Sequence, residues 1–66
     1  MTIKITIEKT PIGYYIRQFV DGLNVIMMSV YKLEIIGNGI IWGYGKGNDL
    51  IIIIAPSDYD EIEYQL

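Results

Sequence analysis

Four acidic residues near the C-terminus are the side chains of this sequence best suited to chemistry: Asp58, Asp60, Glu61 and Glu63. Carboxylates are ligands for hard cations, and a pair of them can act as general acid and base. The spacing does not fit an EF-hand loop, which needs a glycine at its sixth position and an acid at its twelfth. No second catalytic group is evident in the sequence. We therefore expect neither a metal ion nor a catalytic site in this segment.

The same segment alternates its acids with apolar side chains, because Tyr59, Ile62 and Tyr64 lie between or beside them. Acids speed the encounter with a basic surface, and buried rings slow dissociation. We expect an edge that docks to a basic, nucleic-acid-binding partner protein; a solvated acidic edge is the alternative. The predicted partner-binding residues are Asp58, Tyr59, Asp60, Glu61, Glu63 and Tyr64.

The two residue types that most often carry catalysis are absent. The chain has no histidine and no cysteine, which removes the commonest general base, thiolate nucleophiles, thiolate metal sites and disulfides. No other nucleophile–base pair is recognisable. We expect a protein that is not an enzyme and that uses no cofactor.

The glycine-rich residues 43–47 have the composition of a phosphate-binding loop. A Walker loop needs a glycine five residues before its Gly-Lys pair and a hydroxyl residue after that pair. Ile40 and Gly47 occupy those two positions, and no helix is predicted to follow and direct its amides at a phosphate. The pattern favours a hairpin turn.

Six tyrosines and one tryptophan are many aromatic side chains for 66 residues. Such rings can stack nucleobases, but they also fill cores and anchor interfaces. Residues 1–57 carry five basic and four acidic side chains, whereas the last nine residues carry four acids and no base. This charge balance suits nucleic acid poorly, so we expect the rings in a core or an interface. The candidates for base stacking, the alternative, are Tyr14, Tyr15, Tyr31, Trp42 and Tyr44, with Arg17, Lys32 and Lys46.

Strands and tight turns are predicted along nearly the whole chain. Residues 2–8 alternate isoleucine with polar residues, which is typical of a strand with one wet face. Asp21-Gly22 and Gly37-Asn38-Gly39 are hairpin signals because these residue types tolerate positive φ. Further strands are expected at residues 14–20, 40–44 and 49–55, and residues 23–36 as one bent strand or two strands broken near Ser29.

Two segments leave the choice between strand and helix open. Residues 23–31 contain an apolar stripe with helical spacing, but Val25 and Met28 are apolar on the other side and a hairpin signal precedes them. Residues 57–66 begin with a serine that could cap a short helix, yet residues 61–66 alternate strictly. We favour strands in both.

The predicted architecture is a single all-β domain spanning residues 1–66. We expect a meander of five to seven short antiparallel strands that forms a strongly bent sheet or a small open barrel. Local hairpins make that topology quick to reach. No long apolar segment is present that could span a membrane, and residues 1–8 lack the pattern of a signal peptide, so we expect a cytoplasmic protein.

Four consecutive isoleucines, Ile51, Ile52, Ile53 and Ile54, are the strongest indication of a partner. Neighbouring side chains on a strand point to opposite faces, so a strand of isoleucines has no face for water. So small a domain has little chain to cover the second face. We expect self-association, most simply as a homodimer, through these four residues.

These observations favour a non-enzymatic protein–protein interaction module that self-associates and binds or inhibits a basic partner. Inhibitors encoded by viruses and mobile elements are one class of protein that would use such an edge. Two alternatives are a single-stranded nucleic-acid-binding small barrel and a structural subunit for virion assembly. A pull-down with a nuclease-treated control would distinguish the protein–protein interaction module from the nucleic-acid-binding barrel.

Overall fold

The computed structural model, which describes residues 1–66, contains seven strands and one turn of 3₁₀ helix. The predicted all-β fold of five to seven short strands is therefore confirmed. The elements are β1 (Ile3–Thr10), β2 (Gly13–Val20), β3 (Leu23–Val30), β4 (Lys32–Ile36), β5 (Ile40–Tyr44), β6 (Leu50–Ile54), η1 (Pro56–Asp58) and β7 (Glu61–Gln65).

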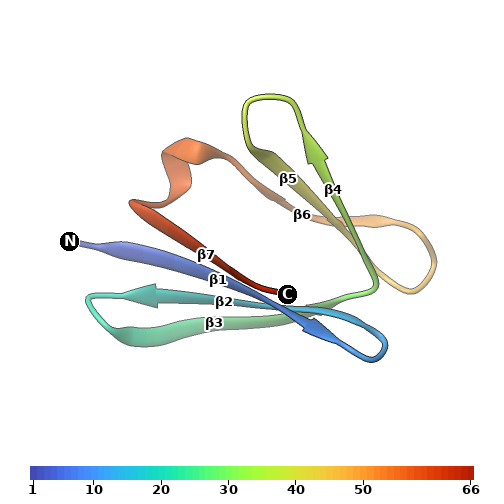
Figure 1. Ribbon diagram of the computed structural model, residues 1–66, viewed down its shortest axis with the longest axis horizontal. Coiled ribbons are helices and arrows are strands. Elements are labelled where there is room, and N and C mark those ends of the chain that lie inside the picture. The colour runs from blue at the N-terminus through green and yellow to red at the C-terminus, as the bar shows by residue number, and fades with distance from the viewer.

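The strands form two sheets that face each other (Figure 1). One sheet has the strand order β3-β2-β1-β7 and the other the order β4-β5-β6. Neighbours are antiparallel except for β1 and β7, which run parallel. A parallel pair needs a crossover connection, and here every element between β1 and β7 serves as that crossover. Because no strand pairing joins the two sheets, they form an open arrangement that agrees with the predicted bent sheet or open barrel.

The hairpin turns follow from residues that accept positive φ. Asp21 and Gly22 have φ of 50° and 85°, and Asn38 and Gly39 have φ of 67° and 78°. Asp21 and Gly22 are the two loop residues between the paired Val20 and Leu23, as in a type I′ turn, whereas Gly37, Asn38 and Gly39 form a three-residue loop between the paired Ile36 and Ile40. Both predicted turns are therefore where the sequence places them, and each one fixes the register of its hairpin.

The two ambiguous segments are strands. Residues 23–30 form seven pairs with β2, with Val25 bulged out of the register, because the Asp21-Gly22 turn folds them directly back onto β2. This pairing overrides the helical stripe. The strand ends at Val30, one residue after the predicted break, and Tyr31 leads into β4. The C-terminal segment contains both expected features in turn, a short 3₁₀ turn and then β7.

The core lies between the sheets and is small. Its six members are 4% exposed or less: Ile5, Ile7, Ile16, Val30, Ile41 and Ile54. The accessible surface of 4313 Å² is close to the roughly 4300 Å² expected for a folded monomer of this mass. The chain is thus normally compact, yet thirteen large apolar side chains remain exposed. Two small sheets cannot enclose the apolar content of this sequence.

Candidate interaction surface

The isoleucine run divides between the core and the surface. Ile52 and Ile54 pair with Gly43 and Ile41 and face the core, where Ile54 is 4% exposed. Ile53 pairs with Trp42 on the outer face and is 54% exposed. The register then shifts between Gly43 and Tyr44, so that Ile51 is an extra, bulged residue and 42% exposed. The monomer leaves about half of each of the Ile51 and Ile53 side chains exposed to solvent.

Gly43 lets β5 lie close both to Ile52 of the neighbouring strand β6 and to Val30 of the other sheet. A Cβ at this position would lie 2.6 Å from Cγ2 of Ile52 and 3.1 Å from Cγ1 of Val30. Real Cβ atoms essentially never approach within 3.0 Å of another atom, so any larger residue would force Ile52 to move. The sequence predicted a strand at residues 40–44, and the structure confirms it as β5 with Gly43 inside it, so the glycine-rich turn begins only after Tyr44. Its role is close packing of β5 against Ile52 and Val30.

The four edge strands of the two sheets fall into two groups, two with charged residues and two without. β3 and β6 contain no charged residue. β4 carries Lys32 and Glu34, and β7 carries Glu61 and Glu63. An edge strand presents unpaired N–H and C=O groups to solvent, and proteins commonly protect such an edge with charged side chains. β3 and β6 lack that protection.

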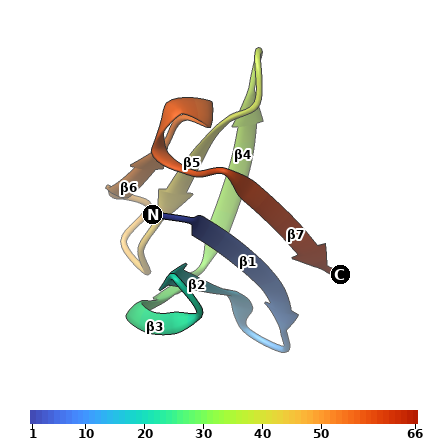
Figure 2. The same cartoon turned by 90° about the vertical axis from the view of Figure 1, so that its left-hand side faces the viewer.

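The two uncharged edges lie on the same side of the molecule. Figure 2 shows β3 and β6 on one side and β4 and β7 on the other. A groove of about 230 Å³ lies between the two sheets on this side, lined by Ile26 of β3, by Ile52, Ile53 and Ile54 of β6, by Ile5, Ile16 and Gln18 of β1 and β2, and by Asp58. The exposed apolar side chains of these two strands define a surface that we name the open side: Leu23, Val25, Ile26, Met27, Leu50, Ile51 and Ile53.

The outer face of the three-stranded sheet continues this apolar surface. Trp42 and Ile53 are paired, and so are Tyr44 and Leu50. Towards the charged edge, Lys32 Nζ lies 5.1 Å from the Tyr44 ring centroid. A hydrogen bond to Glu34 is the main cause of a raised pKa for the Tyr44 hydroxyl. The face therefore grades from charged at β4 to wholly apolar at β6.

Two of the four C-terminal acids hold the chain in place. Asp58 Oδ2 accepts a hydrogen bond of 2.8 Å from the backbone N–H of Ala55, which closes the turn η1. Asp60 Oδ2 accepts one of 2.7 Å from the N–H of Ile3, which ties the start of β7 to β1. Such side-chain bonds to backbone satisfy donors that the strand and turn ends leave free.

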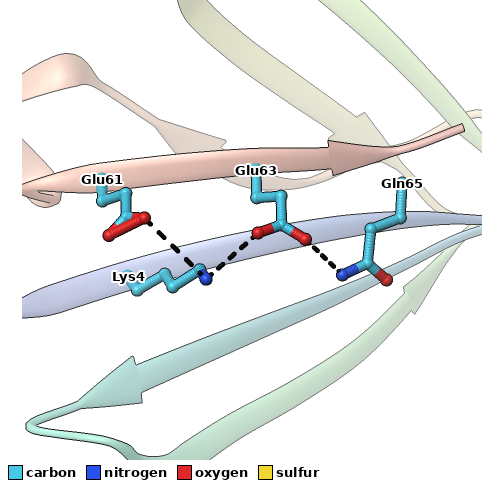
Figure 3. A network of polar contacts seen from close by, with 4 residues as sticks. All are labelled: Lys4, Glu61, Glu63 and Gln65. Atoms are coloured by element: carbon cyan, nitrogen blue, oxygen red, sulfur yellow. Dashed lines mark hydrogen bonds and ion pairs between the residues drawn. The ribbon is translucent and has the colours of Figure 1, made fainter.

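The other two acids surround a lysine on the outer face of the four-stranded sheet (Figure 3). Lys4 Nζ lies 3.1 Å from Glu63 and 3.9 Å from Glu61, and Gln65 Nε2 donates a 2.7 Å hydrogen bond to Glu63. The Gln65 bond and the Lys4 charge lower the pKa of Glu63. The hydrogen bond and charge of Glu63, with the charge of Glu61, raise the pKa of Lys4.

The acids and the apolar side chains of the tail lie on opposite faces of β7. Ile62 pairs with Ile5 and contacts the core, and Tyr64 pairs with Ile7 on that same face. Tyr59 also packs against the core. Glu61 and Glu63 point the other way, with Lys4. The structure therefore does not bring the predicted partner-binding residues together on one surface, and docking through the tail stays a prediction.

The aromatic side chains do not gather on one surface either. Lys9 covers the Tyr14 ring and Arg17 covers the Tyr15 ring, at 5.0 and 4.7 Å from the ring centroids. Tyr14 and Tyr15 are neighbours in β2 and so lie on opposite faces of one sheet, while Trp42 and Tyr44 lie on the outer face of the other sheet. A continuous platform for stacking successive bases is not formed by these rings.

The absence of charge over β3 is the feature of the open side that the sequence reasoning missed. The signal is present in Leu23–Val30, where no residue is charged, but the sequence does not reveal that this strand is an edge.

No three acidic side chains converge into a metal-ligand cluster, and none of the helical segments has the length and apolar character of a membrane span. Comparison of the chain with protein-family models, with curated proteins and with solved structures found no match.

Proposed function

We propose that this protein is a non-enzymatic interaction module whose open side binds a second copy of the same chain. The observation that carries the proposal is β6, an unpaired edge of five consecutive apolar residues with three of them exposed. An exposed, uncharged edge strand is a site for pairing with another chain.

The partner fits because an edge of this composition is complementary to itself. Two β6 strands can pair in antiparallel fashion about a two-fold axis, which joins the three-stranded sheets into one sheet of six strands. Pairing satisfies the free backbone groups of both edges without any charge repulsion. The same axis brings the uncharged β3 edges of the two copies towards each other, whereas the charged β4 and β7 edges point away from the interface.

The energy available is of the size that a dimer needs. The seven side chains of the open side are between 42% and 72% exposed. Covering each one contributes roughly 1 kcal/mol, since full burial of such a side chain is worth about 1.5–3 kcal/mol. Two copies therefore gain at most about 14 kcal/mol if all seven side chains are covered, which is comparable with the association cost of roughly 4–15 kcal/mol. A dimer is therefore energetically feasible, and the oligomeric state must be measured.

Sedimentation equilibrium on three proteins tests the proposal. The wild type is expected to dimerise, and Ile53→Lys is expected to be a folded monomer because it places a charge on the pairing edge. Ile35→Lys is the matched control: Ile35 is 65% exposed but lies on the charged β4 edge, so the variant should dimerise like the wild type. A wild-type monomer at high micromolar concentration, or equal dimerisation by all three proteins, would refute the proposal.

A further inference from the structure

The outer face of the four-stranded sheet contains a hollow that differs from the rest of this apolar molecule. It has a volume of about 380 Å³ and lies over β1 and β7, next to the turn between β2 and β3. Small-molecule sites typically have volumes of about 300–1000 Å³. Phe19 is the one hydrophobic residue among the seven that line it; the others include Thr2, Lys4, Thr6, Glu61 and Gln65.

The polar groups of this hollow are held in place before any ligand arrives. Lys4 is fixed between Glu61 and Glu63, and Gln65 is fixed by its bond to Glu63 (Figure 3). The bond of Gln65 uses its Nε2, so its Oε1 is left as an acceptor. The longer 3.9 Å separation from Lys4 leaves Glu61 free to accept further hydrogen bonds. Preorganised groups of this kind lose little freedom when they bind.

Thr6 provides an independent indication of a ligand. It lines the hollow, it is only 6% exposed, and its Oγ1 has no hydrogen-bond partner. A buried hydroxyl without a partner is costly, and such a group in a folded protein calls for an explanation. Its neighbours across the sheet are Arg17 and Glu63, whose long and partly exposed side chains can move to let a ligand hydroxyl reach Oγ1.

The charges of the hollow select the class of ligand. A cation would meet the ammonium group of Lys4, and an anion would meet the carboxylate of Glu61 at the wall, with Glu63 already paired to Lys4 behind it. A neutral molecule with adjacent hydroxyl groups suits both, because each hydroxyl can donate to a carboxylate or amide oxygen and accept from Lys4 or Thr6. The apolar ring of Phe19 can cover a face of C–H groups.

We propose that this hollow binds a neutral saccharide ring. Glu61 and Gln65 Oε1 accept hydrogen bonds from its hydroxyls, Lys4 donates to them, Thr6 Oγ1 completes its own hydrogen bonding with one of them, and Phe19 packs against the apolar face of the ring. The hollow lies over β1 and β7, away from the β6 edge that is proposed to pair, so the proposal does not depend on dimerisation.

Titration of ¹⁵N-labelled protein with glucose, galactose, mannose and N-acetylglucosamine, followed by amide chemical shifts, tests the proposal. At least one sugar is expected to shift amides of β1 and β7 with millimolar affinity. Glycerol, which has hydroxyls but no ring, is expected to cause smaller shifts. Calcium chloride and sodium phosphate are the arms for a cation and an anion site. Shifts by either salt without shifts by any sugar, or no shifts on this face at all, would overturn the proposal.

Variants separate a binding role from a structural one. Thr6→Val removes the buried hydroxyl and keeps the side-chain shape, so it should fold and weaken sugar binding roughly tenfold. Glu61→Gln and Gln65→Ala change exposed residues and should also weaken binding. Glu34→Gln, a carboxylate on the other sheet, is the control and should bind like the wild type. Unchanged affinity in Thr6→Val and Glu61→Gln together would show that these residues form no sugar site.

Discussion

Truncation of two neighbouring isoleucines tests the central feature of this structure, the division of β6 into a core face and an open face. Ile54 is 4% exposed and belongs to the core, and Ile53 is 54% exposed. Ile54→Ala leaves a cavity between the sheets, and such a change costs about 2–5 kcal/mol. Ile53→Ala removes methylenes that water already reaches, so its cost to the monomer should be below about 1 kcal/mol.

The difference is large relative to the stability of so small a domain. At roughly 0.05–0.15 kcal/mol per residue, 66 residues give a free energy of unfolding of about 3–10 kcal/mol. Ile54→Ala should therefore remove a large part of it and lower the Tm by about 10 °C or more. Ile53→Ala should lower the Tm by a few degrees at most when the protein is dilute.

Urea unfolding, followed by the fluorescence of Trp42, the single tryptophan, measures both effects. The series must be repeated at several protein concentrations, because dimerisation adds stability that depends on concentration. At high concentration Ile53→Ala should lose this added stability, while Ile54→Ala should be destabilised at every concentration. Equal losses in the two variants in dilute solution would mean that the assignment of faces in β6 is wrong.

Three further changes have defined outcomes. Gly43→Ala should cost about 1–3 kcal/mol in thermal unfolding, because its Cβ would lie 2.6 Å from Ile52, whereas Gly37→Ala meets open space and should be neutral. The pKa of Glu63 is lowered below 4.5, so the ionised carboxylate stabilises the fold above that pH. This stabilisation is lost as the pH falls through the lowered pKa. Glu63→Gln cannot ionise, so its urea midpoint should lack this part of the pH dependence. In tests of the tail against an immobilised polybasic protein, Glu61→Lys should slow association, as added salt should, with only a small loss of stability from the exposed pair with Lys4. Glu61→Lys tests the charge of the tail more directly than Asp58→Lys, because Asp58→Lys also breaks the hydrogen bond to Ala55. If Glu61→Lys leaves the association rate unchanged, the tail is only a solvated edge.

The hairpins of this fold could be predicted because their information is local. Asp21-Gly22 fixes where β2 turns into β3, and Asn38-Gly39 does the same for β4 and β5. These turns also decided against the helical stripe in residues 23–31. The parallel pairing of β1 with β7 could not be predicted, because it joins Lys4 to Glu61 across the whole chain and no local signal specifies such a register.

The candidate surface was predicted in part for the same reason. The isoleucine run correctly indicated a strand with too few polar positions. Simple alternation does not predict that both Ile51 and Ile53 are exposed, because the bulge opposite Gly43 and Tyr44 interrupts it. The edge position of β3 and the hollow beside Lys4 depend on strand order and on the β1–β7 pairing. They became visible only with the tertiary structure.

The two proposed surfaces have a joint consequence that can be tested. Antiparallel pairing of two β6 strands relates the copies by an axis perpendicular to the shared sheet, so the same face of each copy points in the same direction. The four-stranded sheets then lie on one side of the dimer, and both hollows face that side. Two sites that face one way can bind a single multivalent ligand, which raises the overall affinity without any new contact.

The wild type should therefore bind a surface coated with the sugar found in the titration more tightly than it binds the free sugar. Ile53→Lys, as a monomer with an intact hollow, should bind the free sugar like the wild type and lose only the gain on the coated surface. If both proteins gain equally on that surface, the hollows do not act together and the two-fold arrangement through β6 is wrong.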